Sequence, residues 1–319
     1  MTLSLTACTP NKALVIASSD TSHGLITELN TSGGSSGMEQ IGDRSYLVVY
    51  DLKRNNDGIR LGLVSVSHSA LTVSPIPFTS WGKGGIANDL ESICAVTGKP
   101  NEYLIAESGD WQGKLGRIFH IRVDTTKLKA SIIGSVEIPM IHRNDLDEIG
   151  DQYEAMACLP YDENQRIVVL GERGGSTVYP NGKVRWGILN IDDHAFIMDE
   201  KGLAGIDVNV PGNWTHRETK RNITDFHIDP NGGIWASASE DPGDIGPFYS
   251  VIYLLGHIEL PNKEIPFAIH KTIEVAKDIN GFKVEALSGQ CKGISGSHSF
   301  GTEDELFGGV WRPIDIESN

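Results

Sequence analysis

The fold is decided by a stretch that reads Asp89-Leu-Glu-Ser-Ile-Cys-Ala-Val96 and continues, after a turn, as Tyr103-Leu-Ile-Ala-Glu-Ser-Gly-Asp110. An acidic residue opens a short apolar segment, turn-forming residues follow, and a second apolar segment ends in another acidic residue. Short runs of β-branched and aromatic residues separated by turn residues are typical of strands. The stretch therefore predicts two antiparallel strands with an acidic side chain at each open end.

The same block recurs along the chain. Copies begin near residues 4, 39, 91, 154, 225 and 285, and a third apolar segment follows each pair. Repeats of about 40–50 residues that hold four strands are typical of β-propeller blades. The sequence therefore predicts an all-β chain that folds as one β-propeller domain over residues 1–319, with six blades favoured and five as the alternative. The first and last copies lack a fourth strand, so we expect the two termini to share the closing blade.

The composition restricts the partners. The chain has 319 residues, 27 Lys and Arg against 42 Asp and Glu, and a formal net charge of −15. Such a surface repels nucleic-acid phosphates and anionic membranes, and it attracts cations. No run of 18 apolar residues occurs, so the sequence predicts no membrane-spanning helix. We expect no nucleic-acid partner, and we expect a small anionic or ester substrate to be held through a metal ion.

The four cysteines are widely spaced and form no C-x-x-C pair, which excludes a zinc ribbon and a dense disulfide scaffold. Cys94 and Cys158 lie inside apolar segments, so the sequence predicts that they are small buried hydrophobic residues. Leu5-Thr6-Ala7-Cys8 resembles a lipoprotein cleavage site, but a basic segment and a long apolar segment do not precede it. The interpretation favoured here is a first strand, and the location is left open: the chain as given would be a cytoplasmic bacterial protein. An exported lipoprotein with Cys8 lipidated, and a start upstream of Met1, is the alternative.

The acidic residues of the repeat are expected to line one end of a central channel. The first strand of a propeller blade is innermost, and the second returns antiparallel to it, so both acids of each block face the same end. The first predicted ring comprises Glu39, Glu91, Glu154, Asp225 and Glu285. The second comprises Asp51, Glu107, Glu172, Glu240 and Glu303. So many carboxylates must be protonated, paired with cationic side chains or bound to a metal ion. Carboxylate oxygens in number suit Ca²⁺; the alternative is a structural ring that accepts backbone hydrogen bonds.

At the level of motifs, the chain resembles the phytase-like esterase propellers and related bacterial propeller families of uncharacterised function. The resemblance rests on the D-x-E-[SAG]-[ILM] openings, on Gly301-Thr-Glu-Asp-Glu305 and on Gly308-Gly-Val-Trp-Arg312. Gln40, Ser92, Ala155 and Ala286 replace the glycine that usually follows the acid in those families. The resemblance implies a propeller with an acid-lined channel, and the chain is more distantly similar to five-bladed calcium-dependent nucleotidases, which also have such a channel.

Two functions follow as hypotheses. In the first, the chain is a Ca²⁺-dependent hydrolase of phosphoesters or esters. The first ring would hold the metal at Glu39, Glu91, Glu154, Asp225 and Glu285, and the proposed catalytic residues are Glu107, Glu172, Glu303 and His298. In the second, a non-enzymatic propeller binds a protein or glycan partner on its top face and keeps the metal as a structural ion. A weaker variant uses Trp81, Trp111 and Trp214 as a sugar- or peptide-binding surface.

Overall fold

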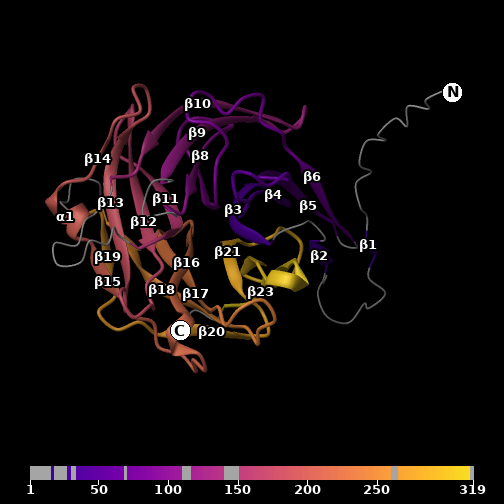
Figure 1. The fold of residues 1–319 in the computed structure, drawn as a ribbon, viewed down its shortest axis with the longest axis vertical. Coiled ribbons are helices and arrows are strands. Elements are labelled where there is room, and N and C mark those ends of the chain that lie inside the picture. Colours follow the sequence, from indigo (N-terminus) through magenta and orange to yellow (C-terminus); the bar gives the residue numbers. More distant parts are fainter. Residues whose placement is uncertain are drawn as a thin grey trace.

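A computed structural model describes residues 16–17, 27–29, 34–67, 70–109, 116–139, 151–259 and 265–316. In these residues the chain forms five antiparallel sheets arranged around a central axis (Figure 1). The prediction of an all-β propeller is confirmed. The number of blades is five, the alternative, rather than the favoured six.

Each blade begins with an innermost strand and proceeds outward by antiparallel pairing. The first blade contains β3 (Ser35–Gly42), β4 (Ser45–Tyr50), β5 (Leu61–Val66), β6 (Ala70–Pro75) and, on its outer edge, β1 (Ile16–Ala17). The second contains β7 (Leu90–Ala95), β8 (Glu102–Glu107), β9 (Arg117–Asp124) and β10 (Lys129–Glu137). The third contains β11 (Tyr153–Pro160), β12 (Gln165–Glu172) and β13 (Gly182–Asn190), with β14 (Phe196–Ile197) and β15 (Ile206–Val208) both pairing with β13.

The last two blades complete the circle. The fourth contains β16 (Lys220–Ile228), β17 (Gly233–Glu240) and β18 (Tyr249–Ile258), with β19 (Phe267–Ile269) and β20 (Val275–Asn280) on the edge of β18. The fifth contains β21 (Val284–Gly289), β22 (His298–Thr302) and β23 (Gly309–Ile314), and β2 (Thr27–Leu29) pairs with β23. The helical elements are α1 (Glu200–Ala204) and the 3₁₀ turns η1 (Arg217–Thr219) and η2 (Glu305–Phe307). Within the described ranges, none of the helices has the length and apolar character that a bilayer crossing requires.

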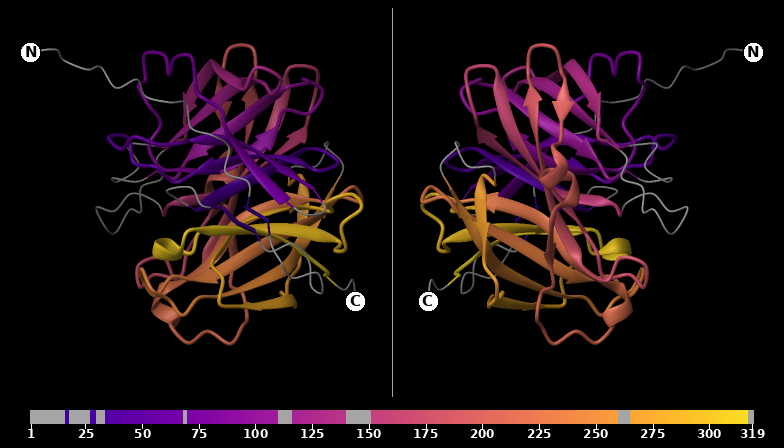
Figure 2. Two further views of the ribbon diagram at one scale, coloured as in Figure 1. Left: turned by 90° about the vertical axis from the view of Figure 1, so that its right-hand side faces the viewer. Right: turned by 90° about the vertical axis from the view of Figure 1, so that its left-hand side faces the viewer.

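The innermost strands form a closed ring. β3, β7, β11, β16 and β21 each contact the next, and β21 contacts β3, so that the yellow C-terminal blade lies against the indigo start of the first blade (Figures 1 and 2). Five of the six predicted block openings coincide with these strands. The sixth, near residue 4, lies outside the described residues. The described part of the segment that follows it supplies edge strands to two sheets, β1 to the first and β2 to the fifth, which is why a repeat count favoured one blade too many.

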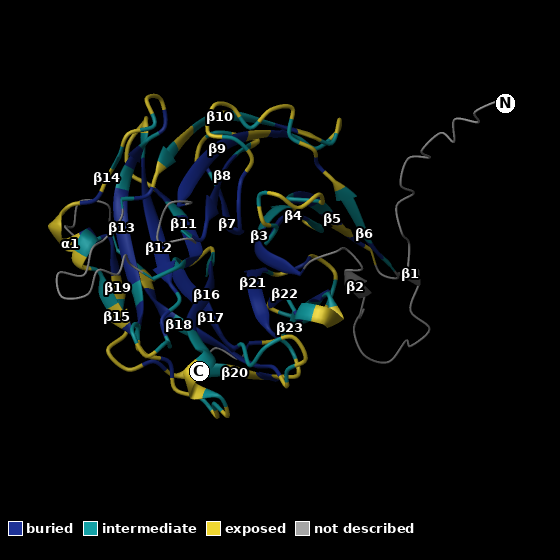
Figure 3. Ribbon diagram, in the orientation of Figure 1, coloured by how far each residue is buried: buried dark blue, intermediate teal, exposed yellow. Residues whose placement is uncertain are grey.

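The hydrophobic core lies between the blades. Leu47 and Val49 of β4 pack with Leu90 and Ile93 of β7, so the first two blades share one apolar layer. The inner strands are buried along most of their length (Figure 3). Full burial of such an aliphatic side chain contributes roughly 1.5–3 kcal/mol. The inner strands are therefore held rigidly, and side chains at their ends have fixed positions.

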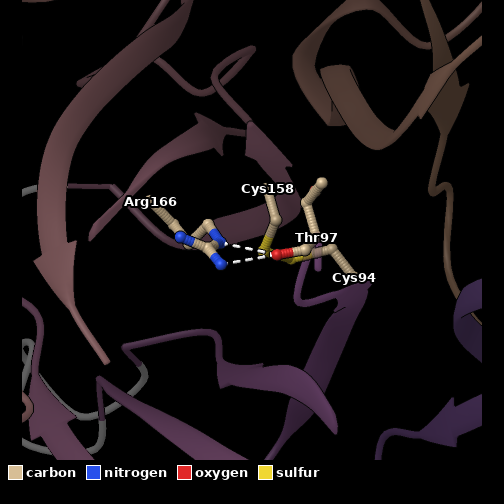
Figure 4. Close-up of a disulfide and its surroundings, with 4 residues drawn as sticks. All are labelled: Cys94, Thr97, Cys158 and Arg166. Carbon is tan, nitrogen blue, oxygen red and sulfur yellow. Dashed lines mark hydrogen bonds between the residues drawn. A yellow bond between two sulfur atoms is a disulfide. The ribbon is translucent and has the colours of Figure 1, made fainter. Parts of the chain in front are cut away.

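A disulfide bond joins two neighbouring inner strands. Cys94 of β7 and Cys158 of β11 are bonded, with their Cα atoms 5.8 Å apart (Figure 4). Beside the bond, Arg166 donates to the Thr97 carbonyl through Nε at 2.9 Å and Nη2 at 2.5 Å. The prediction that these cysteines are merely buried thiols is wrong, because neighbouring blades bring together residues 64 positions apart in the sequence. Cys291 is a buried free thiol, and Cys8 lies outside the described residues.

Reduction of this bond is expected to lower the stability by about 2–4 kcal/mol, because the cross-link restricts a long loop in the unfolded chain. The measurement is the urea midpoint with and without a reductant. A Cys94→Ala/Cys158→Ala variant serves as the control, since its midpoint should no longer respond to the reductant. A wild-type midpoint that is the same under both conditions would refute the bond.

Candidate functional site

Three glutamates occupy equivalent positions at one end of the channel, which we call the mouth. Glu91, Glu154 and Glu285 are each the second residue of an inner strand, and each lies at a register shift in the pairing with the second strand. Such β-bulges redirect the extra side chain. The repeat thus places the three carboxyl groups around one opening, as the sequence predicted for these residues.

One half of the mouth is neutralised by cationic side chains, and we call it the basic half. Arg221 Nη1 lies 3.4 Å from Glu154 Oε2 and 2.9 Å from Glu285 Oε1. Lys283, which is 1 % exposed, lies 3.2 Å from Glu285 and 3.0 Å from Glu303. The full set of this half comprises Glu154, Arg173, Arg221, Asp241, Lys283, Glu285 and Glu303.

The other half is dominated by carboxylates, and we call Asp51, Asp89 and Glu91 the acidic trio. One oxygen from each lies within 4.8 Å of the others. Lys53 binds Asp89 directly and lies 3.4 Å from Asp51, while Ser108 Oγ donates to Asp89 at 2.7 Å. Two of the three carboxylates, Asp51 and Asp89, therefore share a single lysine.

Glu91 is the member of the trio that lacks a partner. Its side chain is buried, with 7 % of the residue exposed, and it makes no hydrogen bond or ion pair to any described residue. Asp51 Oδ1 is likewise buried without a hydrogen bond. Asp89 has a φ of 62°, a left-handed conformation that is costly for a residue with a side chain. A buried carboxylate without a partner, a second with one oxygen that accepts no hydrogen bond, and a strained backbone at one point mark the trio as the candidate functional site.

The surroundings shift the pKa values of the three carboxyl groups in different directions. Burial, reinforced by Asp89, raises the pKa of Asp51 to about 8. Burial and the charges of Glu154 and Asp89 hold the pKa of Glu91 well above its usual range. Burial alone would raise the pKa of Asp89, but hydrogen bonds from Asp51 and Lys53 keep it below its ordinary value. At neutral pH the trio must therefore keep protons or bind a cation.

Glu39 and Asp225 do not lie at the level of the other three glutamates. In β3 the register shift falls at Ser36, which accepts a hydrogen bond from the Asp51 amide, and Glu39 lies three residues further along the channel. Burial raises the pKa of Glu39 to about 7. Asp225 accepts from the Phe226 and Leu287 amides at 2.8 and 2.7 Å. The five residues of the predicted ring thus lie at two depths in the channel. The sequence could not predict this difference, because a short motif does not show where a β-bulge falls.

Glu107 and Glu172 are enclosed in their own blades. Glu107 is 0 % exposed and accepts from Arg117 at 2.8 and 2.5 Å, and Glu172 accepts from Arg185 at 2.6 and 3.2 Å. No substrate can reach either carboxylate, so they hold adjacent strands together. Of the predicted second ring, Asp51 and Glu303 do lie at the mouth.

The structure places His298 at the opposite end of the channel. It pairs with Gly289, the last residue of β21, whereas the mouth lies at the first residues of that strand. Five strand residues span roughly 16 Å. The His298 ring packs against Trp235 and His227. The expectation that His298 lies near the mouth is therefore wrong.

The sequence reasoning missed Lys53, Arg221 and Lys283, and it gave Asp89, the first acid of the D-x-E opening, no role at the site. Lys53 follows Asp51 by two residues. Arg221 and Lys283 precede two of the ring acids in sequence, Asp225 and Glu285. A search for cations next to the acidic positions would have identified them.

No family model matches the chain, and no curated protein matches it. Among solved structures, a thermostable family-43 glycoside hydrolase has a TM-score of 0.51 and 9 % identity over 90 % of this chain and 89 % of its own. An exo-β-1,3-galactanase from Phanerochaete chrysosporium has a TM-score of 0.49 and 12 % identity over 94 % of this chain and 64 % of its own. A xylan β-1,4-xylosidase from Bacillus halodurans has a TM-score of 0.42 and 9 % identity, over 89 % and 53 %. At such identities the likeness establishes the propeller fold alone, and it does not support the phytase-like esterase family.

Proposed function

We propose that the mouth is the active site of a hydrolase that acts on glycans and that the acidic trio holds a divalent cation, with Ca²⁺ preferred. The observation that carries the proposal is the geometry of the trio, in which three carboxylates converge within 4.8 Å and Glu91 has no partner. Convergent, uncompensated carboxylates on rigid strands are what a metal-assisted hydrolytic site requires.

The donor set fits a hard cation. The trio offers carboxylate oxygens, and two of its groups, Glu91 and Asp51 Oδ1, have no hydrogen bond to give up. Ca²⁺ takes six to eight oxygen ligands in variable geometry, whereas Mg²⁺ demands a near-ideal octahedron. When bound, such an ion polarises a substrate oxygen and makes a coordinated water more acidic.

The remaining mouth residues have positioning roles in this proposal. Lys53 and Ser108 fix Asp89, and Arg221 and Lys283 fix the opposite wall. Glu303 is the proposed proton acceptor, because it lies at the mouth with 14 % of its side chain exposed. Glu107 and Glu172 are excluded as proton acceptors, since both carboxylates are enclosed within their own blades.

A glycan replaces the phosphoester or ester of the sequence-based hypothesis. The support is the shared fold with a family-43 glycoside hydrolase, which is an analogy at the level of fold. A free polyanionic phosphate is also disfavoured by the net charge of −15.

The test is turnover of a panel of aryl glycosides and oligosaccharides with Ca²⁺ or with a chelator. We expect hydrolysis with Ca²⁺, at least a hundredfold loss in the chelator, and a similar loss in Glu91→Gln. Glu39→Gln is the control, since Glu39 lies deeper in the channel and should keep the activity. Turnover that is equal with and without the chelator would contradict the role of the metal, and turnover of phosphoesters in place of glycans would contradict the substrate.

A glycan-binding propeller without catalysis is the second candidate. It is favoured by the basic half, where Arg221 and Lys283 hold Glu154 and Glu285 in ion pairs and leave few free acids for proton transfer. In that case oligosaccharides bind at the mouth, Ca²⁺ stabilises the fold, and no product forms.

A further inference from the structure

A cavity lies between the third and fourth blades, against the strand that carries Arg221. Its volume is about 730 Å³, within the range of small-ligand sites. Its walls come from the segment after β12, which includes Ser176 and Asn181, and from the segment before β16, which includes Asn209 and Trp214. None of the mouth residues lines it, so it is separate from the acidic trio.

This cavity shares a wall with the mouth. Lys220 lines the cavity, while the next residue, Arg221, binds Glu154 and Glu285 at the mouth. Successive side chains of a strand point to opposite faces, so β16 separates the two sites by the thickness of one strand. Gly175, in the other wall, lies directly against this strand. A Cβ atom at position 175 would be 1.3 Å from the Lys220 carbonyl oxygen, so only glycine allows this close contact.

The cavity is positively charged in an acidic protein. Lys220 Nζ donates to Asn209 Oδ1 at 2.9 Å and makes no ion pair with any described residue. Arg217, which also lines the cavity, has neither a hydrogen bond nor an ion pair from its guanidinium within the described part of the chain. Burial and the charge of Arg217 lower the pKa of Lys220, as expected for two neighbouring cations. Glu218 is the one acid in the lining.

Trp214 supplies a fixed aromatic surface next to these cations. Its indole N–H donates to the Val210 carbonyl at 3.1 Å, and its ring meets Tyr249 edge-on at a centroid distance of 5.0 Å. Lys220 Nζ lies 5.7 Å from the Trp214 ring centroid. A flat aromatic ring packs against the apolar face of a sugar, while amides such as Asn181 and Asn209 suit its hydroxyl groups.

We propose that this cavity, lined by Trp214, Arg217 and Lys220, binds a negatively charged sugar residue, carboxylated or sulfated, of the glycan held at the mouth. The proposal rests on the proposed function for its placement next to a glycan site. Two cations without acidic partners would bind the anionic group, and Trp214 would bind the sugar ring. The carboxylates of the mouth alone would repel an anionic ligand. The cations of the neighbouring cavity would offset this repulsion.

The experiment measures binding in a chelator, without turnover, by calorimetry with trigalacturonate, a sulfated trigalactoside and a neutral trigalactoside. We expect at least one of the two anionic trisaccharides to bind about tenfold more tightly than the neutral one, and the comparison of the two identifies the anionic group. Lys220→Gln and Arg217→Gln are each expected to weaken the anionic ligand about tenfold and to leave the neutral one unchanged. Trp214→Leu is expected to weaken all three.

Two controls separate this proposal from the others. Lys183→Gln removes a lysine that is paired with Asp207 outside the cavity and should leave binding unchanged. Glu91→Gln should bind the anionic trisaccharide as the wild type does, even if all activity is lost. Equal affinity for neutral and anionic trisaccharides, or full affinity in the Lys220→Gln/Arg217→Gln double variant, would overturn the anionic-sugar site. Absence of turnover with binding intact would refute the hydrolase alone.

Discussion

Millimolar Ca²⁺ is expected to raise the melting temperature of the wild type by about 5 °C and to leave Glu91→Gln unchanged. A ligand at a hundredfold excess over its Kd stabilises the native state by about 2.7 kcal/mol, and each kcal/mol corresponds to about 2 °C in a chain of this size. Glu91 has no partner other than the proposed ion, so its replacement removes a ligand without breaking an existing interaction. The measurement is a thermal scan with Ca²⁺ and with a chelator.

The matched control is Glu39→Gln, which removes another, half-buried channel acid that lies three residues beyond the bulge position of β3. It should keep the full Ca²⁺ response. In the chelator, Glu91→Gln should be as stable as the wild type or more so, because it removes a carboxyl group whose pKa is raised by burial and by the charges of Glu154 and Asp89. A wild-type melting temperature that does not respond to Ca²⁺, or a variant that responds fully, would contradict a cation site on the trio.

The fold could be predicted because each inner strand carries the same short pattern. Glu91, Glu154 and Glu285 all follow the first residue of such a strand, and the structure places all three at the mouth. The number of blades could not be fixed in the same way. The sixth predicted opening lies near residue 4, outside the described residues, and only the pairing of β1 with β6 and of β2 with β23 shows that the strands after it complete two other sheets.

The site was predicted less completely than the fold, because its chemistry depends on contacts between blades. Arg221 of the fourth blade lies between Glu154 of the third and Glu285 of the fifth, and no spacing within one repeat indicates this. The acidic trio likewise combines Asp51 of the first blade with Asp89 and Glu91 at the start of the second. The same reason explains the disulfide between Cys94 and Cys158.

Arg221→Gln is expected to have the largest effect on stability, a loss of about 3–5 kcal/mol. Removing one partner of a buried ion pair leaves the remaining charges without compensation, and such changes typically cost this much. Arg221 is 18 % exposed, and Glu154 and Glu285 are 3 % and 2 % exposed in their side chains. Arg173→Gln is the matched control, since Arg173 also lies 3.5 Å from Glu154 but is 30 % exposed. It should cost less than about 1 kcal/mol.

The stability lost in Arg221→Gln should depend on pH, and the burial of Glu154 and Glu285 determines whether the loss is greater at low or at high pH. Burial already raises the pKa of Glu285 from 4.5 to about 8, and it also raises that of Glu154. Without Arg221 both pKa values rise further, so the folded state must either keep protons that the unfolded chain releases or hold uncompensated charges. The penalty is therefore greatest above pH 8 and falls away as the pH drops below about 8, because Glu285 is then protonated in the folded wild type and in the folded variant alike, while the pKa of the unfolded chain is the same for both. Urea unfolding at pH 5 and pH 9 measures the difference, and Arg221→Gln/Glu285→Gln should recover part of the lost stability at pH 9. A loss that is the same at both pH values, or a double variant no more stable than Arg221→Gln, would show that Arg221 acts by packing and not by neutralising the mouth.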